Sequence, residues 1–353
     1  MQPPPLMPSA GAPAAQSAPP RFFYERWSWR LGAMAIWTAF LLLLVVIVGI
    51  IGAEASSHFL SENNFRGILD RVVLLGLIVP PMVMIIAAGG VDLSVGATAG
   101  FVAVLTGSLL RHMGIAPAFA IAVWLALIVG IANGLLVGLG RIHAVIVTLG
   151  MALLLRGLCH GLSGSQVRFL GDAPSRGLVG LLSSPYFAWP LLALVSFGTI
   201  LLVEMTRIAR RPAPGPDEQA ESSAARTLYV ALPYVLAALT AAMAAGIWLR
   251  RMGVAEPMLG TWWEADVIFA VILGGTCLGG RFGNVVGALV GIVLVVMIQQ
   301  ILYLKGVSSF FSLVVIGMGL LAFAVIGRLY YGLLGWLYRR SLARRTPALQ
   351  PVG

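Results

Sequence analysis

The chain has 353 residues, of which 59% are hydrophobic and only 10% are charged. This composition excludes an ordinary soluble domain and predicts a protein that crosses a membrane several times. The 23 basic residues outnumber the 13 acidic ones, which gives a net charge of +10, but they lie at the ends of apolar runs. That placement is typical of membrane topology and contact with anionic lipid, and it argues against a nucleic-acid-binding face.

The two ends of the chain differ from its middle. Residues 1–20 are rich in Pro and Ala and carry no charge, so we expect a disordered N-terminal tail. We assign residues 21–340 to one transmembrane domain and residues 341–353 to a cytoplasmic C-terminal tail. Because Cys159, Cys277 and the four histidines lack the spacing of metal ligands, no metal site and no cofactor are predicted.

Apolar runs of spanning length occur ten times along the chain. They predict an all-α polytopic membrane protein with about ten transmembrane helices. Two runs, 95–110 and 266–280, are short, so we expect broken helices or re-entrant segments there. The predicted spans are 31–53, 67–88, 95–110, 115–139, 144–162, 187–204, 227–249, 266–280, 284–304 and 310–332.

An even number of spans places both termini on one side of the membrane, which we assign to the cytoplasm. Fourteen basic residues then lie inside and nine outside. This bias agrees with the positive-inside rule. The nine outer basic residues are Arg66, Arg71, Arg111, Arg156, Arg168, Arg176, Arg250, Arg251 and Lys305.

Residues 205–226 form the most polar loop between the termini. The loop is first basic, then rich in Pro and Gly, and finally acidic. Its second half contains good helix formers, so a short surface helix and a plain solvated linker are equally consistent with the residues. The charged residues of the loop are Arg207, Arg210, Arg211, Asp217, Glu218 and Glu221.

The most informative stretch is AAGGVDLSVGA, residues 87–97, where an aspartate interrupts strongly apolar sequence. An acid inside a membrane span is disfavoured by about 2.5–3.5 kcal/mol on insertion scales, so it indicates a functional or structural role. Asp92 is predicted to cap a helix that begins at Leu93, and this is the favoured direct role. The alternative is that it lines a translocation pathway or fixes a hinge, with Gly89, Gly90, Ser94 and Gly96 around it.

A second glycine-rich break occurs at residues 273–284, which read LGGTCLGGRFGN. So many glycines are incompatible with an ordinary helix interior, and we expect a turn between two apolar runs. A tight helix crossing is the alternative. Gly274 lies 185 positions after Gly89, which hints at an internal repeat. The pathway residues expected here are Gly274, Gly275, Thr276 and Asn284.

Four further polar residues, Asn133, Thr148, Gln299 and Gln300, lie within apolar runs. Each either lines a polar pathway or forms a hydrogen bond between helices. The chain contains no phosphate-binding loop, because its single lysine, Lys305, lacks the glycines that this motif requires. We therefore expect a transport subunit rather than an enzyme, with any ATP hydrolysis on another chain.

Four sequence blocks, 87–97, 132–158, 269–294 and 306–325, resemble the permease subunits of bacterial ATP-binding-cassette (ABC) importers for ribose and other simple sugars. The resemblance implies a helical permease of about ten spans in the bacterial inner membrane. It implies a homodimer or paralogous heterodimer around a central pathway, a cytoplasmic ATPase and a periplasmic or lipid-anchored substrate-binding protein. Relatives in the wider superfamily carry branched-chain amino acids or nucleosides, so the substrate does not follow from the fold.

In that family, the loop corresponding to residues 205–226 carries the coupling helix that contacts the ATPase. Here Thr206 and Arg207 match, but the rest of the loop departs from the family pattern and is shorter by about three residues. Either the ATPase has diverged with the loop or coupling is impaired. Two other functions remain open: a proton-driven secondary transporter with Asp92 as the relay, and a membrane scaffold without transport activity.

Overall fold

The computed structural model describes residues 27–171, 184–205, 224–276, 283–308, 310–323, 325–326 and 329. The fold is all-α apart from one pair of very short strands. The helices in chain order are α1 (Trp27–Ala55), α2 (Glu62–Gly76), α3 (Val79–Ala87), α4 (Val95–Leu109), α5 (Ile115–Gly138), α6 (Ala144–Ser163), α8 (Pro185–Met205), α9 (Ala224–Met252), α10 (Trp263–Leu273) and α11 (Val285–Leu304), followed by a helical segment at Phe310–Phe323.

Each of the ten predicted apolar runs contains helix, which confirms the polytopic α-helical class. In the described part of the chain, six helices are long and apolar enough to cross a membrane. The short spans are confirmed as well: α4 has 15 residues and α10 has 11, too few to cross a bilayer alone. The prediction for the second short run was wrong at its end, because α10 stops at Leu273 rather than near residue 280.

The second apolar run, predicted at 67–88, corresponds to one candidate membrane span at Glu62–Ala87, so the span itself is confirmed. It begins earlier, at Glu62, where the Ser61 hydroxyl accepts a hydrogen bond from the Asn64 N–H at 3.4 Å. It is also divided into α2 and α3 at residues 77–78. The reason is local, because Pro80 and Pro81 occupy the first turn of α3 and cannot donate to carbonyls of the preceding turn.

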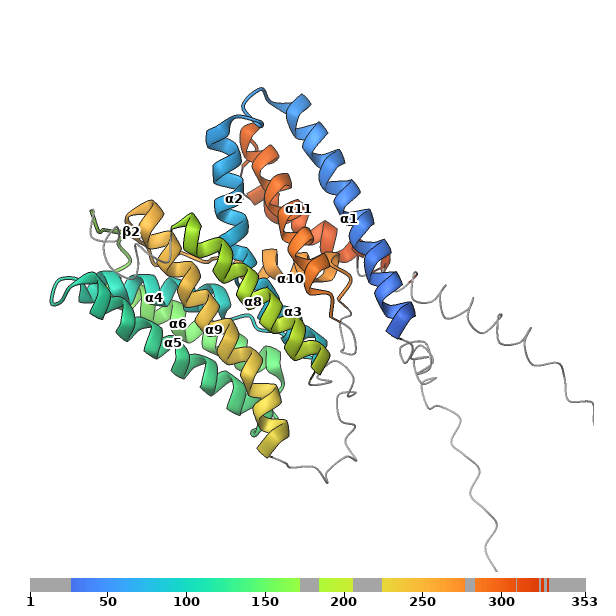
Figure 1. Cartoon of the computed structure of the whole chain (residues 1–353). Helices are drawn as coiled ribbons and strands as arrows, with labels where there is room; N and C mark the ends of the chain where they lie inside the picture. The colour runs from blue at the N-terminus through green and yellow to red at the C-terminus, as the bar shows by residue number, and fades with distance from the viewer. Residues whose placement is uncertain are drawn as a thin grey trace, which may run out of the picture.

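The helices form two groups that meet at α3 and α10, and α8 packs on α2, α3 and α11 (Figure 1). Helices α4, α5, α6 and α9 pack together in one group, and α1, α2 and α11 pack in the other. All nine residues of α3 are buried, so this helix lies at the centre of the core.

Glycines allow α5 and α9 to approach closely. A Cβ added at Gly134 would lie 2.6 Å from the Ala231 Cα, and one at Gly130 would lie 2.8 Å from the Val235 Cα. Membrane helices commonly pack through small residues. The hydrophobic effect does not drive helices together in lipid, so close van der Waals contact between their backbones does.

The outer helix α1 has a different surface. Ile36 and Leu43 are among its many exposed apolar side chains, as expected for a helix that faces lipid.

Two strands, β1 (Arg168–Phe169) and β2 (Val254–Ala255), pair in antiparallel register, with Arg168 opposite Ala255 and Phe169 opposite Val254. The Leu170 N–H also donates to the Gly253 carbonyl at 2.8 Å. The pair ties the segment after α6 to the segment after α9, two chain regions that were both predicted on the outer side.

Candidate functional site

The first helix break follows α3 and has a well-defined geometry. Gly89 adopts a left-handed backbone with φ 88°. Its N–H donates to the Ile86 carbonyl at 3.0 Å, and the Gly90 N–H donates to the Ile85 carbonyl at 2.9 Å. These two bonds define a Schellman motif, in which a glycine at the left-handed position ends the helix. The predicted break at Gly89 and Gly90 is therefore confirmed.

Asp92 does not cap a helix at Leu93, so the favoured prediction for its direct role was wrong in its position. Helix α4 begins at Val95, and Ser94 occupies the cap position. The Oδ1 atom of Asp92 accepts hydrogen bonds from the Ser94 N–H at 2.8 Å and from the Ser94 hydroxyl at 2.7 Å. The aspartate therefore shapes the turn before the helix instead of binding the free N–H groups of its first turn.

Three of the predicted pathway residues meet around this turn, and a fourth touches it. The Ser94 hydroxyl accepts a hydrogen bond from Nδ2 of Asn133, on α5, at 2.9 Å. The Thr148 hydroxyl, on α6, lies 3.3 Å from the Val91 carbonyl and donates to the Ala144 carbonyl at 2.9 Å. Asp92, Ser94, Asn133 and Thr148 are all buried. We call this set the polar cluster.

The polar cluster retains unused hydrogen-bonding capacity. The Oδ1 atom of Asn133 is buried and has no hydrogen-bond partner among the described residues. A buried acceptor without a partner is costly, typically by about 1–3 kcal/mol, so a water molecule or another donor at this atom would stabilise the cluster.

The glycines on both sides of Asp92 are required by close contacts. A Cβ on Gly90 would lie 2.5 Å from the Tyr234 hydroxyl oxygen. A Cβ on Gly96 would lie 2.0 Å from the Gly260 carbonyl oxygen and 2.4 Å from Oε2 of Glu264. The structure thus gives Gly96 a packing role against the segment that leads into α10.

The second break follows α10 and ends in the same way as the first. Gly275 has φ 85°, its N–H donates to the Ile272 carbonyl at 2.9 Å, and the Thr276 N–H donates to the Val271 carbonyl at 3.2 Å. This is again a Schellman motif. The equivalent glycines are Gly89 and Gly275, 186 positions apart, so the register suggested by the sequence was wrong by one residue.

Asn284 closes the second break. Its Oδ1 accepts from the Gly287 N–H at 2.9 Å and thereby caps α11. Its Nδ2 donates to the Gly274 carbonyl at 2.9 Å, and its backbone N–H donates to the Thr276 hydroxyl at 3.2 Å. Asn284 therefore holds both ends of the break together. A Cβ on Gly274 would lie 2.3 Å from the Ala288 nitrogen, so α10 and α11 touch at their backbones.

The two breaks lie side by side. A Cβ on Gly283, in the second break, would lie 2.8 Å from Cγ1 of Val83 and 3.3 Å from Cβ of Ala87. Val83 and Ala87 belong to the last turns of α3, directly before Gly89. The structure therefore brings the two predicted pathway motifs into one region of the core.

A network of charged residues was missed by the sequence reasoning. Asp266, on α10, is buried, lies 3.6 Å from Nη2 of Arg71 and accepts a hydrogen bond from Nε2 of Gln299 at 2.7 Å. Next to Arg71 on α2, Asp70 forms an ion pair with Arg251 on α9. Two features of the sequence could have indicated this network: the acidic residue Asp266 in the first turn of the short span at 266–280, and Gln299 inside the apolar run at 284–304.

Two further charged residues, Glu264 and Arg156, lie near the N-terminal end of α10. The Oε2 atom of Glu264 is buried with no hydrogen-bond partner among the described residues. Arg156, on α6, donates through Nη1 to the carbonyls of Pro257 at 2.6 Å and Leu259 at 2.8 Å. These contacts fix the segment between β2 and α10 against α6. Gln300, the remaining polar residue predicted within an apolar run, donates a hydrogen bond through Nε2 to Oδ1 of Asn64 in the first turn of α2.

The predicted coupling residues lie outside the described part of the chain, which has a gap between Met205 and Ala224. Their roles remain predictions. They are Arg207, Arg210, Arg211, Asp217, Glu218 and Glu221.

Residues 64–324 match the model of the family described as the branched-chain amino acid transport system permease component. The chain is 32% identical over 285 residues to the ribose import permease protein RbsC of Escherichia coli (strain K12), covering 78% of this chain and 88% of that protein. It is 34% identical over 299 residues to RbsC of Bacillus subtilis (strain 168), covering 82% and 90%.

A further relative is the L-arabinose ABC transporter permease protein AraH of Azospirillum brasilense, which is 29% identical over 273 residues, 76% of this chain and 80% of AraH. No solved structure matches the chain. The chain belongs to the branched-chain amino acid transport system permease family, and it is a multi-pass membrane permease and a transport subunit. The two glycine-rich breaks and the polar cluster all lie within the matched residues.

Proposed function

We propose that this chain is the membrane-spanning subunit of an ATP-driven ABC importer for a monosaccharide or a related small polar solute. The names of the relatives support this substrate class: ribose for RbsC and L-arabinose for AraH. The match extends over most of each relative, so it reflects the whole permease and not a shared fragment.

The single observation that carries the proposal is the polar cluster at the first break. Transporters bind substrate where membrane helices are interrupted and polar groups face a pathway. Asp92, Ser94, Asn133 and Thr148 provide carboxylate, hydroxyl and amide groups, which bind sugar hydroxyls in general. The second break, with Gly274, Gly275, Thr276 and Asn284, would form the other wall of the pathway.

Partner chains complete the proposed transporter. ATP hydrolysis takes place on a cytoplasmic ATPase, since the sequence has one lysine and no phosphate-binding loop. A periplasmic or lipid-anchored binding protein delivers the solute, and two permease subunits, identical or paralogous, enclose the pathway. Residues 205–226 contact the ATPase.

The proposed location is the bacterial inner membrane, with both termini in the cytoplasm. Two contacts join span ends that this topology places on one side, whereas the contact of Gly96 with Gly260 joins a predicted inner span end to a predicted outer loop. Asn64 and Gln300, both near predicted outer ends of spans, are bonded, and β1 pairs with β2 on the same side. At the other side, a Cβ on Gly138 would lie 3.3 Å from the Thr227 carbonyl, so two predicted inner ends meet.

The test is uptake by proteoliposomes that contain the tagged chain and the ATPase that co-purifies with it. The binding protein that co-purifies is added outside, and uptake of radiolabelled ribose, arabinose and leucine is measured. We expect ATP-dependent uptake of a sugar that needs all three components, and no ATP hydrolysis by the chain alone. Uptake driven by a pH gradient without the ATPase would instead support the proton-driven alternative.

A further inference from the structure

Helix α1 packs mainly on α11, at the edge of the described structure (Figure 1). It precedes residues 64–324, which match the family model. Much of its surface is apolar and exposed, including Ile36 and Leu43. Two adjacent side chains, Trp37 and Thr38, are half-buried instead and reach the residues around the second break.

Trp37 binds the end of α10. Its Nε1 atom donates a hydrogen bond to the Leu273 carbonyl at 2.7 Å. Leu273 is the last residue of α10, and the carbonyls of a last turn lack partners within their own helix. Because lipid supplies no donors, the donor has to come from the protein. The indole ring also covers Gly275, since a Cβ on Gly275 would lie 3.0 Å from Cδ1 of Trp37.

Thr38 binds the residue that caps α11. Nδ2 of Asn284 donates to Oγ1 of Thr38 at 3.3 Å and to the Gly274 carbonyl at 2.9 Å. An amide group has two N–H donors, so Asn284 makes both bonds at once. Its Oδ1 atom accepts from the Gly287 N–H. Thr38 therefore contacts the same amide that joins the end of α10 to the start of α11.

The two residues together connect one rigid helix to both sides of the second break. Helix α1 is continuous over 29 residues, from Trp27 to Ala55. The Phe40 ring, one turn after Trp37, lies with its centroid 5.7 Å from that of the indole and supports it. A change in the spacing of α10 and α11 would strain or break the hydrogen bonds of Trp37 and Thr38.

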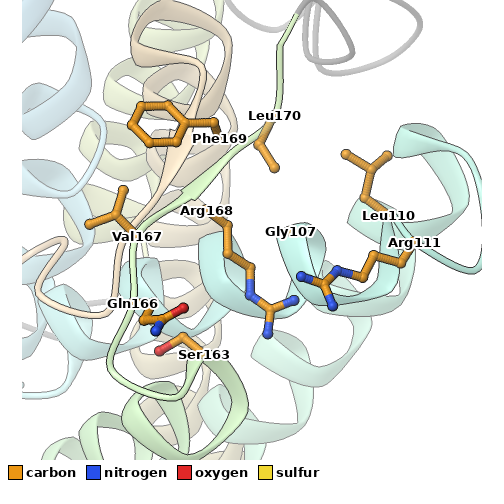
Figure 2. A pocket seen from close by; sticks show the side chains of 9 residues that line it. All are labelled: Gly107, Leu110, Arg111, Ser163, Gln166, Val167, Arg168, Phe169 and Leu170. Carbon is orange, nitrogen blue, oxygen red and sulfur yellow. The ribbon is translucent and has the colours of Figure 1, made fainter.

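This contact is distinct from the cavity of about 330 Å³ that Figure 2 shows. That cavity is lined by the last residues of α4, by Ser163 of α6 and by the segment that follows α6. Among the described residues, none from α1, α10 or α11 lines it, so variants at Trp37 or Thr38 leave its lining unchanged.

We propose that Trp37 and Thr38 are positioning residues for transport, and that α1 holds the end of α10 and the cap of α11 at the spacing that the pathway requires. Neither residue contacts the solute in this role. Trp37 acts through Leu273 and Gly275, and Thr38 acts through Asn284. The inference rests on the proposed function, because the role of the second break as a wall of the pathway is taken from there.

The test uses proteoliposomes that contain the full chain with its ATPase and binding protein. Initial uptake of the radiolabelled sugar that the wild type transports is measured against sugar concentration, and ATP hydrolysis is measured in parallel. Trp37→Phe removes the indole donor but keeps an aromatic ring. Thr38→Val removes the hydroxyl at nearly constant shape, and Thr38→Ser restores it. The matched control is Trp124→Phe, at an indole on α5 that is 60% exposed.

The decisive quantity is the amount of sugar taken up for each ATP hydrolysed. A loss of folded protein lowers both rates and leaves this ratio unchanged, whereas a displaced wall of the pathway lowers the ratio. We expect a fall of about threefold to tenfold for Trp37→Phe and for Thr38→Val, as for the loss of one hydrogen bond, with the KM for sugar nearly unchanged. Thr38→Ser and Trp124→Phe should keep the wild-type ratio.

A double variant, Trp37→Phe with Thr38→Val, tests whether both residues act on the same break. Its effect should be smaller than the product of the two single effects, because neighbouring residues with a shared partner are coupled. A wild-type ratio in both single variants overturns the inference. Equal losses in Thr38→Val and Thr38→Ser overturn it as well, because the hydroxyl would then have no role. If Trp37→Phe does not fold, the comparison of the two Thr38 variants decides.

The wild-type measurement separates this inference from the proposed function. If the wild-type chain takes up no sugar with its ATPase and binding protein, the proposed function fails and the inference fails with it. If the wild type takes up sugar and the variants at Trp37 and Thr38 do so with the same ratio, only the role of α1 is refuted.

Discussion

Gly96 on α4 and Gly260 before α10 are in direct backbone contact. A Cβ on Gly96 would lie 2.0 Å from the Gly260 carbonyl oxygen, and a Cβ on Gly260 would lie 2.1 Å from the Gly96 carbonyl oxygen. No side chain fits at either position unless the helices separate. The contact holds the N-terminal end of the short helix α4 against the segment that leads into the short helix α10.

We therefore expect Gly96→Ala to lower the thermal stability of the folded permease strongly, because overpacking typically costs about 1–3 kcal/mol. The control is Gly157→Ala, on α6, where an added Cβ meets no atom within 4 Å. That substitution should be neutral or slightly stabilising, since alanine is favoured over glycine in helices by about 1 kcal/mol. Equal melting temperatures for the two variants in detergent would contradict the close contact.

The second prediction separates the structural and transport roles of Asp92. Asp92→Asn keeps an oxygen that accepts both hydrogen bonds from Ser94, so the folded yield should equal that of the wild type. Asp92→Ala removes the acceptor and should lower the folded yield. Fluorescence-detected size exclusion measures both. A well-folded but inactive Asn variant, together with pH-dependent uptake by the wild type, would favour a proton relay over this assignment.

The third prediction concerns the ion pair between Arg71 and Asp266. Arg71→Ala leaves the carboxylate of Asp266, whose side chain is 4% exposed, without its cation. The Arg71 side chain is 45% exposed, so the pair is only partly buried, and we expect a fall in thermal stability that is larger than for a fully exposed pair. Arg66→Ala is the matched control on the same helix, because Arg66 and Glu62 form an exposed pair of little energetic value. Similar losses for both variants would show that the pair between Arg71 and Asp266 stabilises the fold no more than the exposed pair does.

The fourth prediction tests the orientation. Single cysteines at Ser61 and at Ser222, in a chain that lacks Cys159 and Cys277, should be labelled from opposite sides of the membrane. An impermeant reagent applied to intact cells should modify the cysteine at position 61 only. Labelling of both positions would contradict the predicted number of spans between them.

The fifth prediction concerns coupling to the ATPase. Charge reversal of Glu218 and Glu221 together should uncouple ATP hydrolysis from uptake without changing expression or topology. The reason is that the loop has few large apolar residues, so its contact with the ATPase depends mainly on charge. Uptake and ATP hydrolysis in proteoliposomes measure the effect. Normal transport by the double reversal would identify residues 205–226 as a plain linker.

The helix breaks could be predicted because their causes are local. A Gly-Gly pair in apolar sequence needs little context to indicate a helix end, and the left-handed φ at Gly89 and Gly275 agrees with that signal. The division of the second span into α2 and α3 had a local signal as well, in Pro80 and Pro81, which the approximate span bounds did not use. The exact start of α4 could not be predicted, because it depends on whether Asp92 or Ser94 occupies the cap position. Hydrophobic periodicity does not distinguish the two.

The charged network could not be predicted in the same way. Arg71, Asp266 and Gln299 are distant in sequence and meet only because α2, α10 and α11 pack against one another. Each of these residues alone is compatible with a membrane-interface position. The strands β1 and β2 are equally non-local, since two residues show no alternation pattern and their pairing is decided by where α6 and α9 end.

The contact of Gly283 with Val83 and Ala87 has a mechanical consequence. The end of α3 supplies the surface on which the second break rests, so a rotation of α3 about Gly89 must displace Gly283 with it. A movement at one interruption would therefore press on the other through this contact.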